Sequence, residues 1–356
     1  MTNPLPPREA VRKMAPYSPP TSGRRGKLRL DFNENTVGCS PAVAAFLKEK
    51  ITADRLATYP EYEEARKALA AHFKVEESQF LLTNGTDEAI QILINTYVEG
   101  GAEVIILQPS YAMYRFYAEL AGAKIREVRY REGNLAFPLP ELLAAVGEQT
   151  RAILISNPNN PTGTATTLEA IEQILKRAPA AAVLVDEAYF EFYGVTALPL
   201  LRRYANLFVT RTFSKTYGMA GLRLGCLFSD ERNLGFVAKA QSPYSVNVLA
   251  ALAARRAVED VAYIRNYVEE VLAARELLYA GLTKLNIRFY RSEGNFILIQ
   301  FGERAASARA ALRAAGILVR DRSHEIPGAL RVTVGTRDQT GTLLCELERF
   351  LQVTAT

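Results

Sequence analysis

Hydrophobic positions along this chain fall into short runs that alternate with longer amphipathic stretches between residues 80 and 210. The runs have the length of buried strands, and most stretches between them repeat apolar residues at helical spacing. This alternation predicts a mainly parallel sheet covered by helices on both faces. The predicted strands are Phe80–Leu82, Val104–Leu107, Lys124–Val128, Ala152–Ile155, Ala182–Val185 and Leu207–Val209, and the helices between them include Tyr111–Ala121, Leu139–Val146 and Thr167–Arg177.

The pattern changes toward both ends of the chain. Prolines recur through the first 29 residues, which predicts an arm or an unstructured tail and no regular core element. Beyond about residue 247 the sequence predicts one continuous helix over Val258–Leu285, followed by strands at Phe296–Gln300 and Leu330–Val334. We therefore expect an α/β chain with an N-terminal arm at 1–36, a large domain at 37–250 and a small α+β domain at 251–356.

Length and composition narrow the class of protein. A chain of 356 residues is long enough for two domains, and its 49% hydrophobic content is ordinary for a globular enzyme. The net charge of +5 is dispersed, so we expect no nucleic-acid partner. No apolar run is long enough to span a membrane, and the N-terminus lacks the apolar core of a signal peptide, so a cytoplasmic location is expected. Three scattered cysteines predict neither a disulfide framework nor a metal site.

Candidate chemistry lies where predicted strands end. Lys215 follows the strand Leu207–Val209, while Asp186 and Tyr189 follow Ala182–Val185. In parallel sheets ligands bind at the carboxyl ends of the strands, so these three side chains are expected to meet. An amine, a buried carboxylate and a phenol suit pyridoxal phosphate: the amine bonds to the cofactor and the carboxylate keeps the ring nitrogen protonated.

Three motifs carry a resemblance to a known family. Asn157–Gly163, Asp186–Tyr189 and the segment from Ser214 to Arg223 resemble the fold-type-I pyridoxal-phosphate aminotransferases. Within them the chain is most similar to the histidinol-phosphate aminotransferase family, from about Tyr17 to the C-terminus. The resemblance implies the fold-type-I architecture, in which a large domain binds the cofactor and a smaller α+β domain follows.

The resemblance also implies a cofactor site. Lys215 would be the catalytic base that bonds to the cofactor, Asp186 would pair with the ring nitrogen, and Tyr189 and Asn160 would donate to the phenolate oxygen. Backbone N–H groups at a helix N-terminus and nearby hydroxyls would bind the phosphate, with an arginine supplying charge. The remaining cofactor residues implied are Gly85, Thr86, Asp87, Thr212, Ser214 and Arg223 at the phosphate, Tyr111 stacked on the ring, and Tyr59 reaching in from the partner subunit of a homodimer.

On the substrate side the resemblance implies Arg331, Arg320, Tyr17 and Asn160, whereas Arg322 is expected at the surface. The expected reaction is histidinol-phosphate:2-oxoglutarate aminotransfer in histidine biosynthesis, with small molecules as its only ligands besides the cofactor. Two alternatives stay open. An aromatic amino-acid aminotransferase and a phospho-amino-acid decarboxylase of the threonine-phosphate type would share the cofactor residues and differ only in the substrate residues.

Overall fold

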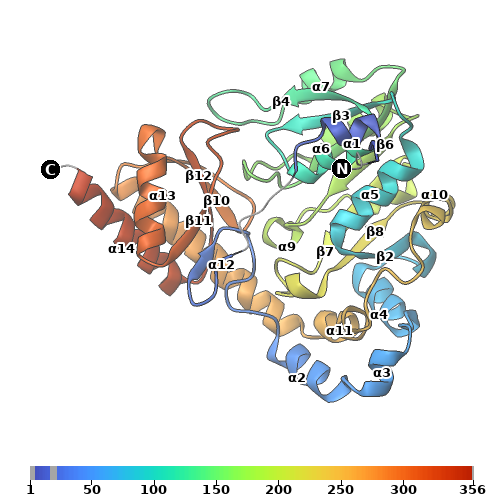
Figure 1. The fold of residues 1–356 in the computed structure, drawn as a ribbon, viewed down its shortest axis with the longest axis horizontal. Helices are drawn as coiled ribbons and strands as arrows, with labels where there is room; N and C mark the ends of the chain where they lie inside the picture. The colour runs from blue at the N-terminus through green and yellow to red at the C-terminus, as the bar shows by residue number, and fades with distance from the viewer. Residues whose placement is uncertain (1–4, 17–21, 355–356) are drawn as a thin grey trace.

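The computed structural model of the chain describes residues 5–16 and 22–354, which build two sheets (Figure 1). The larger sheet has seven strands in the order β2-β8-β7-β6-β5-β3-β4. Only β8 runs antiparallel to its neighbours, so the prediction of a mainly parallel sheet is confirmed. Its strands are β2 (Phe80–Asn84), β3 (Glu103–Gln108), β4 (Lys124–Arg129), β5 (Thr150–Ser156), β6 (Ala182–Asp186), β7 (Leu207–Thr212) and β8 (Leu224–Phe228).

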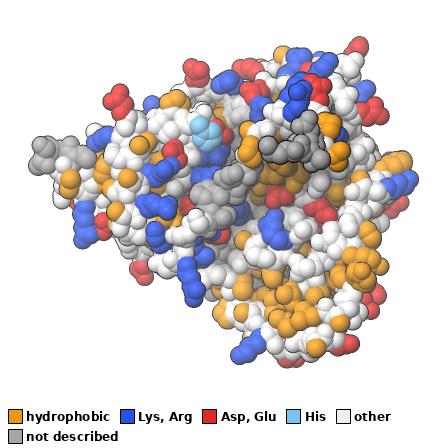
Figure 2. Space-filling model, in the orientation of Figure 1, with side chains coloured by type: hydrophobic (Ala, Val, Ile, Leu, Met, Phe, Trp, Pro, Cys, Tyr) orange, Lys and Arg blue, Asp and Glu red, His pale blue; other side chains and the backbone are white. Residues whose placement is uncertain are grey.

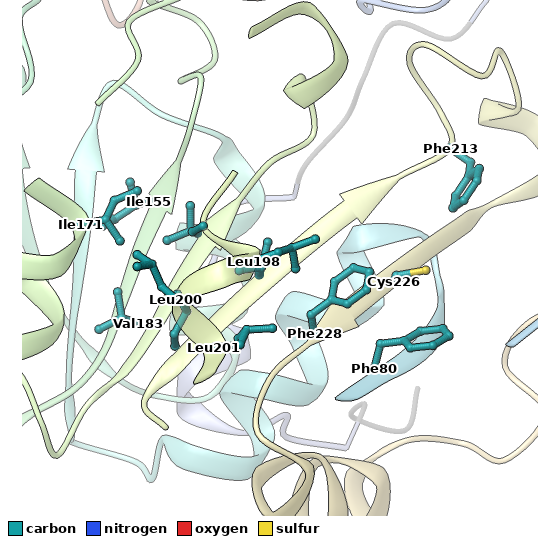
Figure 3. Packing of buried hydrophobic residues seen from close by; sticks show 14 of the residues in the cluster. Phe80, Ile155, Ile171, Val183, Leu198, Leu200, Leu201, Phe213, Cys226 and Phe228 are labelled. Atoms are coloured by element: carbon teal, nitrogen blue, oxygen red, sulfur yellow. The ribbon is translucent and has the colours of Figure 1, made fainter. Parts of the chain in front are cut away.

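Successive residues of a strand point to opposite sides of the sheet, so the unbroken apolar strands make both of its faces apolar. Helices therefore cover both faces. Val183 and Val185 of β6 pack on one face with Phe213 and Phe228, as Figure 3 shows in part. Leu184, between them, packs on the other face. The first face is covered by α4 (Glu63–Phe73), α8 (Leu168–Arg177) and α11 (Val248–Glu259), and the second by α5 (Gly85–Tyr97), α6 (Ala112–Leu120) and α10 (Glu231–Val237).

The second sheet has five strands in the order β1-β11-β12-β10-β9 and lies to the left in Figure 1. Its apolar side chains, including Phe296 and Leu330, form a separate core with three helices. The elements are β1 (Leu28–Leu30), β9 (Arg288–Tyr290), β10 (Phe296–Gln300), β11 (Ile317–Asp321), β12 (Ala329–Thr333), α12 (Val261–Lys284), α13 (Ala305–Ala314) and α14 (Arg337–Thr354).

Two expectations need correction, one about the N-terminal arm and one about the predicted helix Val258–Leu285. The expectation that the first 29 residues form no regular core element fails at their end, where β1 begins at Leu28 and pairs in parallel with β11. The short helix α1 (Glu9–Lys13) has no buried residue and is compatible with an arm. The prolines bar regular structure only locally, and the partner strand β11 was not evident from the sequence. The predicted helix Val258–Leu285 is interrupted at Asp260, whose side chain accepts a hydrogen bond from the backbone of Tyr263 and starts α12.

The other helices connect these layers. Ser40 caps α2 by accepting a hydrogen bond from the backbone of Ala42, directly before the first-turn Pro41. Within the described residues, no helix has both the length and the apolar composition needed to cross a membrane. The remaining helices are α2 (Pro41–Lys50), α3 (Ala53–Ala57), α7 (Leu139–Ala145) and α9 (Phe190–Tyr193).

Candidate active site

A cavity of about 580 Å3 lies where the two sheets meet. Strands β5, β6 and β7 contribute residues at their carboxyl ends, and β11 and β12 contribute residues from the second sheet. The structure thus brings together side chains that are far apart in the sequence. The predicted residues that line the cavity are Thr86, Asp87, Tyr111, Asn160, Asp186, Tyr189, Thr212, Ser214, Lys215, Arg223, Arg320 and Arg331.

Lys215 lies in the loop that follows β7. Its amine donates a hydrogen bond of 2.9 Å to the backbone oxygen of Phe32, a residue that the sequence did not suggest for the site. Burial, together with the nearby Arg331 guanidinium, lowers the pKa of Lys215 to about 8. A pKa near 8 leaves about a tenth of the amines unprotonated at pH 7, so the group can act as a nucleophile and a base.

Asp186 ends β6 and is buried against the cavity wall. One of its oxygens accepts a hydrogen bond from the Thr210 hydroxyl and the other from the Tyr114 phenol, both at 2.9 Å, and the backbone of Ala188 also donates to the carboxylate. Burial nevertheless raises the pKa of Asp186 to about 6. Neither hydroxyl was predicted: Thr210 meets Asp186 through the register of β6 and β7, and Tyr114 meets it through the packing of α6 on the sheet.

Tyr189 lies three residues after Asp186, the last residue of β6, and its side chain is buried. Its phenol oxygen accepts a hydrogen bond of 3.0 Å from the side chain of Asn33, another contact that the sequence did not reveal. The Lys215 amine lies 6.0 Å from the centre of the Tyr189 ring. The phenol, the amine and the carboxylate therefore border one space, as their positions at strand ends predict.

The N-terminus of α5 forms another part of the wall. Gly85 has a φ of +72°, and a Cβ there would lie 2.5 Å from a guanidinium nitrogen of Arg223. Arg223 forms an ion pair of 3.0 Å with Asp87, and the Tyr111 phenol donates to the same carboxylate at 2.8 Å. The side chain of Asp87 thus orients both groups, whereas only its backbone was expected at the phosphate. Thr212 and Ser214 lie buried in the adjoining wall.

Arginines from the second sheet form the opposite wall. Arg331 of β12 is buried and donates to the side-chain oxygen of Asn160 at 2.5 Å and to the backbone oxygen of Asp31 at 2.6 Å. The Arg320 guanidinium lies 5.6 Å from the centre of the Phe32 ring. Arg322 is buried at the cavity and paired with a neighbouring glutamate, so the expectation of a surface arginine was wrong. Arg322 stands two positions after Arg320, and its backbone N–H still bonds to Ala329 of β12, so both arginine side chains fall on the same side of the extended chain and reach the cavity.

Of the predicted residues that the structure describes, Gly85 and Tyr59 do not line this cavity within one chain. Tyr59 is 72% exposed, stacks on Tyr244 at 4.2 Å and borders a different cavity, beside α2 and α11. Tyr17 lies outside the described residues. The roles of Tyr59 and Tyr17 therefore stay predictions.

The cavity fits pyridoxal phosphate on the evidence of Asp186. A buried carboxylate is costly unless a positive charge accompanies it. In the part of the chain that the structure describes, Asp186 accepts hydrogen bonds from hydroxyls and forms no ion pair. A protonated ring nitrogen would supply the charge, and Lys215 lines the same cavity. We conclude that the donor set suits this cofactor.

Comparison with known proteins supports the same conclusion. The family model "Aminotransferase class I and II" matches residues 25–347. A histidinol-phosphate aminotransferase of Geobacillus sp. (strain WCH70) is 35% identical over 96% of this chain and 97% of its own length. One from Anoxybacillus flavithermus is 34% identical over 97% of this chain and 96% of its own.

A solved structure shares the fold. The histidinol-phosphate aminotransferase of Sinorhizobium meliloti, in complex with pyridoxal-5'-phosphate, superposes with a TM-score of 0.87 at 23% identity, and the match covers 98% of both chains. At that identity the likeness supports the architecture alone. Together with the full-length relatives it shows that the chain has the fold-type-I aminotransferase fold and belongs to the histidinol-phosphate aminotransferase family of the class I and II aminotransferases.

Proposed function

We propose that this protein is a pyridoxal-phosphate-dependent aminotransferase that interconverts histidinol phosphate and its keto counterpart, with 2-oxoglutarate and glutamate as the other pair. The observation that carries the proposal is the composition of a single cavity. Lys215 and Asp186 border it on the side of the large sheet, and Arg320 and Arg331 border it on the side of the second sheet. The names of the full-length relatives support the same reaction.

The cofactor, when bound, supplies an aldehyde carbon and an electron-accepting ring. Lys215 would hold it, and the neutral form of its amine, favoured by a lowered pKa, would carry a proton to and from the substrate's reacting carbon. Asp186 would face the ring nitrogen as a carboxylate, and Tyr189 and Asn160 would donate to the ring oxygen. The phosphate would bind at the N-terminus of α5, near Thr212, Ser214 and Arg223.

The substrate side explains the choice of a phosphorylated substrate. Histidinol phosphate has no carboxylate, so its phosphate is the anion that the arginines would bind. Arg331 is held by Asn160 and the Asp31 backbone, which fixes its guanidinium plane for a bidentate contact. Arg320 lies beside the same space, and Tyr17 is predicted to contact the phosphate. A 2-oxoglutarate carboxylate could use the same guanidinium groups in the other half of the reaction.

The proposal includes a homodimer with shared active sites in the cytoplasm. Hydrophobic side chains gather around α2, α4 and α11 in Figure 2, and Tyr59 borders a second cavity of about 950 Å3 that residues of these helices line. A monomer rarely exposes so many large apolar side chains together. A second copy of the chain would cover them and would carry Tyr59 to the cofactor phosphate. The exposed residues are Val37, Ile51, Leu56, Tyr59 and Tyr244.

The test is to identify the lysine that holds the cofactor. The protein loaded with pyridoxal phosphate should be yellow, and reduction with borohydride should fix the cofactor to the peptide that contains Lys215. Lys215→Ala should abolish amino transfer from glutamate while the phosphate-binding residues retain some cofactor. Lys239→Ala removes an exposed lysine and is the matched control, with activity unchanged. Fixation to another lysine would overturn the assignment.

A further inference from the structure

Two tyrosines on α6 and its N-cap connect this helix to the acids of the cavity. Tyr111 and Tyr114 are three residues apart, so they share one face of the helix, and their rings meet edge to face at 5.7 Å. The Tyr111 phenol donates to Asp87, and the Tyr114 phenol donates to Asp186. One helix end thus orients two acids that line the cavity.

Tyr114 has no surface of its own in the cavity. Its side chain is fully buried in the core between the sheet and the helices α5 and α6. It does not line the cavity. Its phenol reaches Asp186 over 2.9 Å, and Asp186 itself lines the cavity. Any effect of Tyr114 on the cofactor must therefore pass through the carboxylate.

We propose that Tyr114 is a positioning residue that holds the Asp186 carboxylate in its ionised form and in fixed orientation toward the cofactor's ring nitrogen. The inference rests on the proposed function, because it assigns Asp186 to that nitrogen. The Thr210 hydroxyl holds the other oxygen, so the two donors together fix the plane of the carboxylate. A hydrogen bond to an ionised acceptor is stronger than a neutral one, and this one lies in a dry interior.

The charges around Asp186 determine how strongly the Tyr114 phenol affects the ionisation of this carboxylate. Asp87, on α5, and the buried Tyr189 also interact electrostatically with Asp186, and the negative charge of Asp87 opposes the ionisation of Asp186. Burial already raises the pKa of Asp186 to about 6. Removing a donor to the charged form raises that pKa further. Asp186 of a Tyr114→Phe variant would therefore be protonated over a wider pH range, extending toward neutrality.

The experiment compares Tyr114→Phe with Tyr130→Phe in the full-length protein loaded with cofactor. Tyr130 is also buried, and within the described residues its phenol oxygen has no hydrogen-bond partner, so its loss controls for removing a buried hydroxyl. Two quantities are measured for each protein. The first is the dissociation constant for pyridoxal phosphate and for an analogue with carbon in place of the ring nitrogen. The second is the pH profile of kcat/KM.

We expect Tyr114→Phe to weaken the binding of pyridoxal phosphate about tenfold and to leave binding of the carbon analogue unchanged. The acid limb of its rate profile should move about one pH unit upward, with activity recovering above it. Tyr130→Phe should resemble the wild type in both measurements. Equal weakening for cofactor and analogue, or an unshifted acid limb, would overturn the proposal and make Tyr114 merely a packing residue. A wild-type protein that binds no pyridoxal phosphate would contradict the proposed function instead.

Discussion

Arg211, near the end of β7, is a buried cation that interacts with two acids, Glu187 and Glu191. Its guanidinium pairs with Glu187 at 2.8 Å and lies 3.9 Å from Glu191, while its flat face lies 3.4 Å from the centre of the Phe190 ring. Glu191 in turn accepts a hydrogen bond from Thr216, the residue after the reactive lysine. The arginine therefore compensates the buried Glu187 and the partly buried Glu191 directly behind the cofactor loop.

Arg211→Met should destabilise the protein strongly, because Glu187 and Glu191 lose their cation in the interior. We expect a loss of about 3–5 kcal/mol in the free energy of unfolding, measured with denaturant. Burial raises the pKa of Glu187 even beside the arginine. Without the cation that pKa rises further, so the deficit should be larger at about pH 8 than at about pH 5.

The matched control is Arg203→Met, which removes a surface arginine paired with Glu172 at 2.6 Å. An exposed pair is worth about 0–1 kcal/mol, so little stability should be lost. Equal losses in the two variants, or a deficit at Arg211 that does not change with pH, would contradict the description of a buried, charged cluster.

Individual site residues were predictable where they lie at or just after the end of a strand. Lys215 and Asp186 follow apolar runs, and parallel strands end at one edge, so the sequence alone placed them together. Asn33 and Tyr114 could not be predicted in the same way. Each reaches its partner across more than 70 residues of chain, through the packing of separate elements, and such packing leaves no local pattern.

Strand β8 and helix α5 (Gly85–Tyr97) are packed with their backbones in contact. A Cβ at Gly225 of β8 would lie 2.8 Å from the carbonyl carbon of Gly85 and 2.9 Å from the nitrogen of Thr86. These two residues open the helix whose N-terminus is proposed to bind the cofactor phosphate. Glycine at this position therefore sets how closely the helix approaches the strand.

Gly225→Ala should push the N-terminus of α5 away from β8 and weaken the binding of pyridoxal phosphate about tenfold or more. Gly235→Ala, in α10 (Glu231–Val237), is the control, since a Cβ there meets no atom within 4 Å. Alanine inside a helix should be neutral or stabilising by about 0.5–1 kcal/mol. Cofactor titration monitored by absorbance measures the difference, and unchanged affinity in Gly225→Ala would argue against a phosphate site at this helix.

Elements were predictable in proportion to how completely their own residues are buried. The central strands carry unbroken apolar runs because helices cover both faces, and the sequence located them. Strand β1 has only three residues, one of them exposed, and its place depends on pairing with the distant β11. The break between α11 and α12 depends on Asp260, a single capping residue in a pattern that otherwise continues as helix.

For the molecule as a whole, the division into an arm at 1–36, a large domain at 37–250 and a small domain at 251–356 stays our proposal. The pairing of β1 with β11 ties the arm to the second sheet. The arm's backbone at Asp31 and Phe32 also accepts hydrogen bonds from Arg331 and Lys215. Arm, large sheet and second sheet thus all contribute to one cavity.

The proposed dimer predicts complementation between two inactive variants. Tyr59→Ala should impair each site, because the tyrosine is expected to serve the partner's cofactor, and Lys215→Ala removes the catalytic amine. Mixed and reassembled subunits should regain about a quarter of the wild-type activity, since half of the dimers then contain one complete site. Full activity of Tyr59→Ala alone, or of a monomer in sedimentation, would refute the shared site.

The most direct test of the proposed function is the rate of the first half-reaction with different amino donors, followed by the absorbance of the bound cofactor. Histidinol phosphate should exceed unphosphorylated histidinol in kcat/KM by a factor of order 10⁴, because unphosphorylated histidinol brings no anion to Arg320 and Arg331. Arg320→Ala should remove most of this preference without changing the cofactor's spectrum. Phenylalanine reacting as fast as histidinol phosphate, or carbon dioxide released from threonine phosphate, would contradict the account.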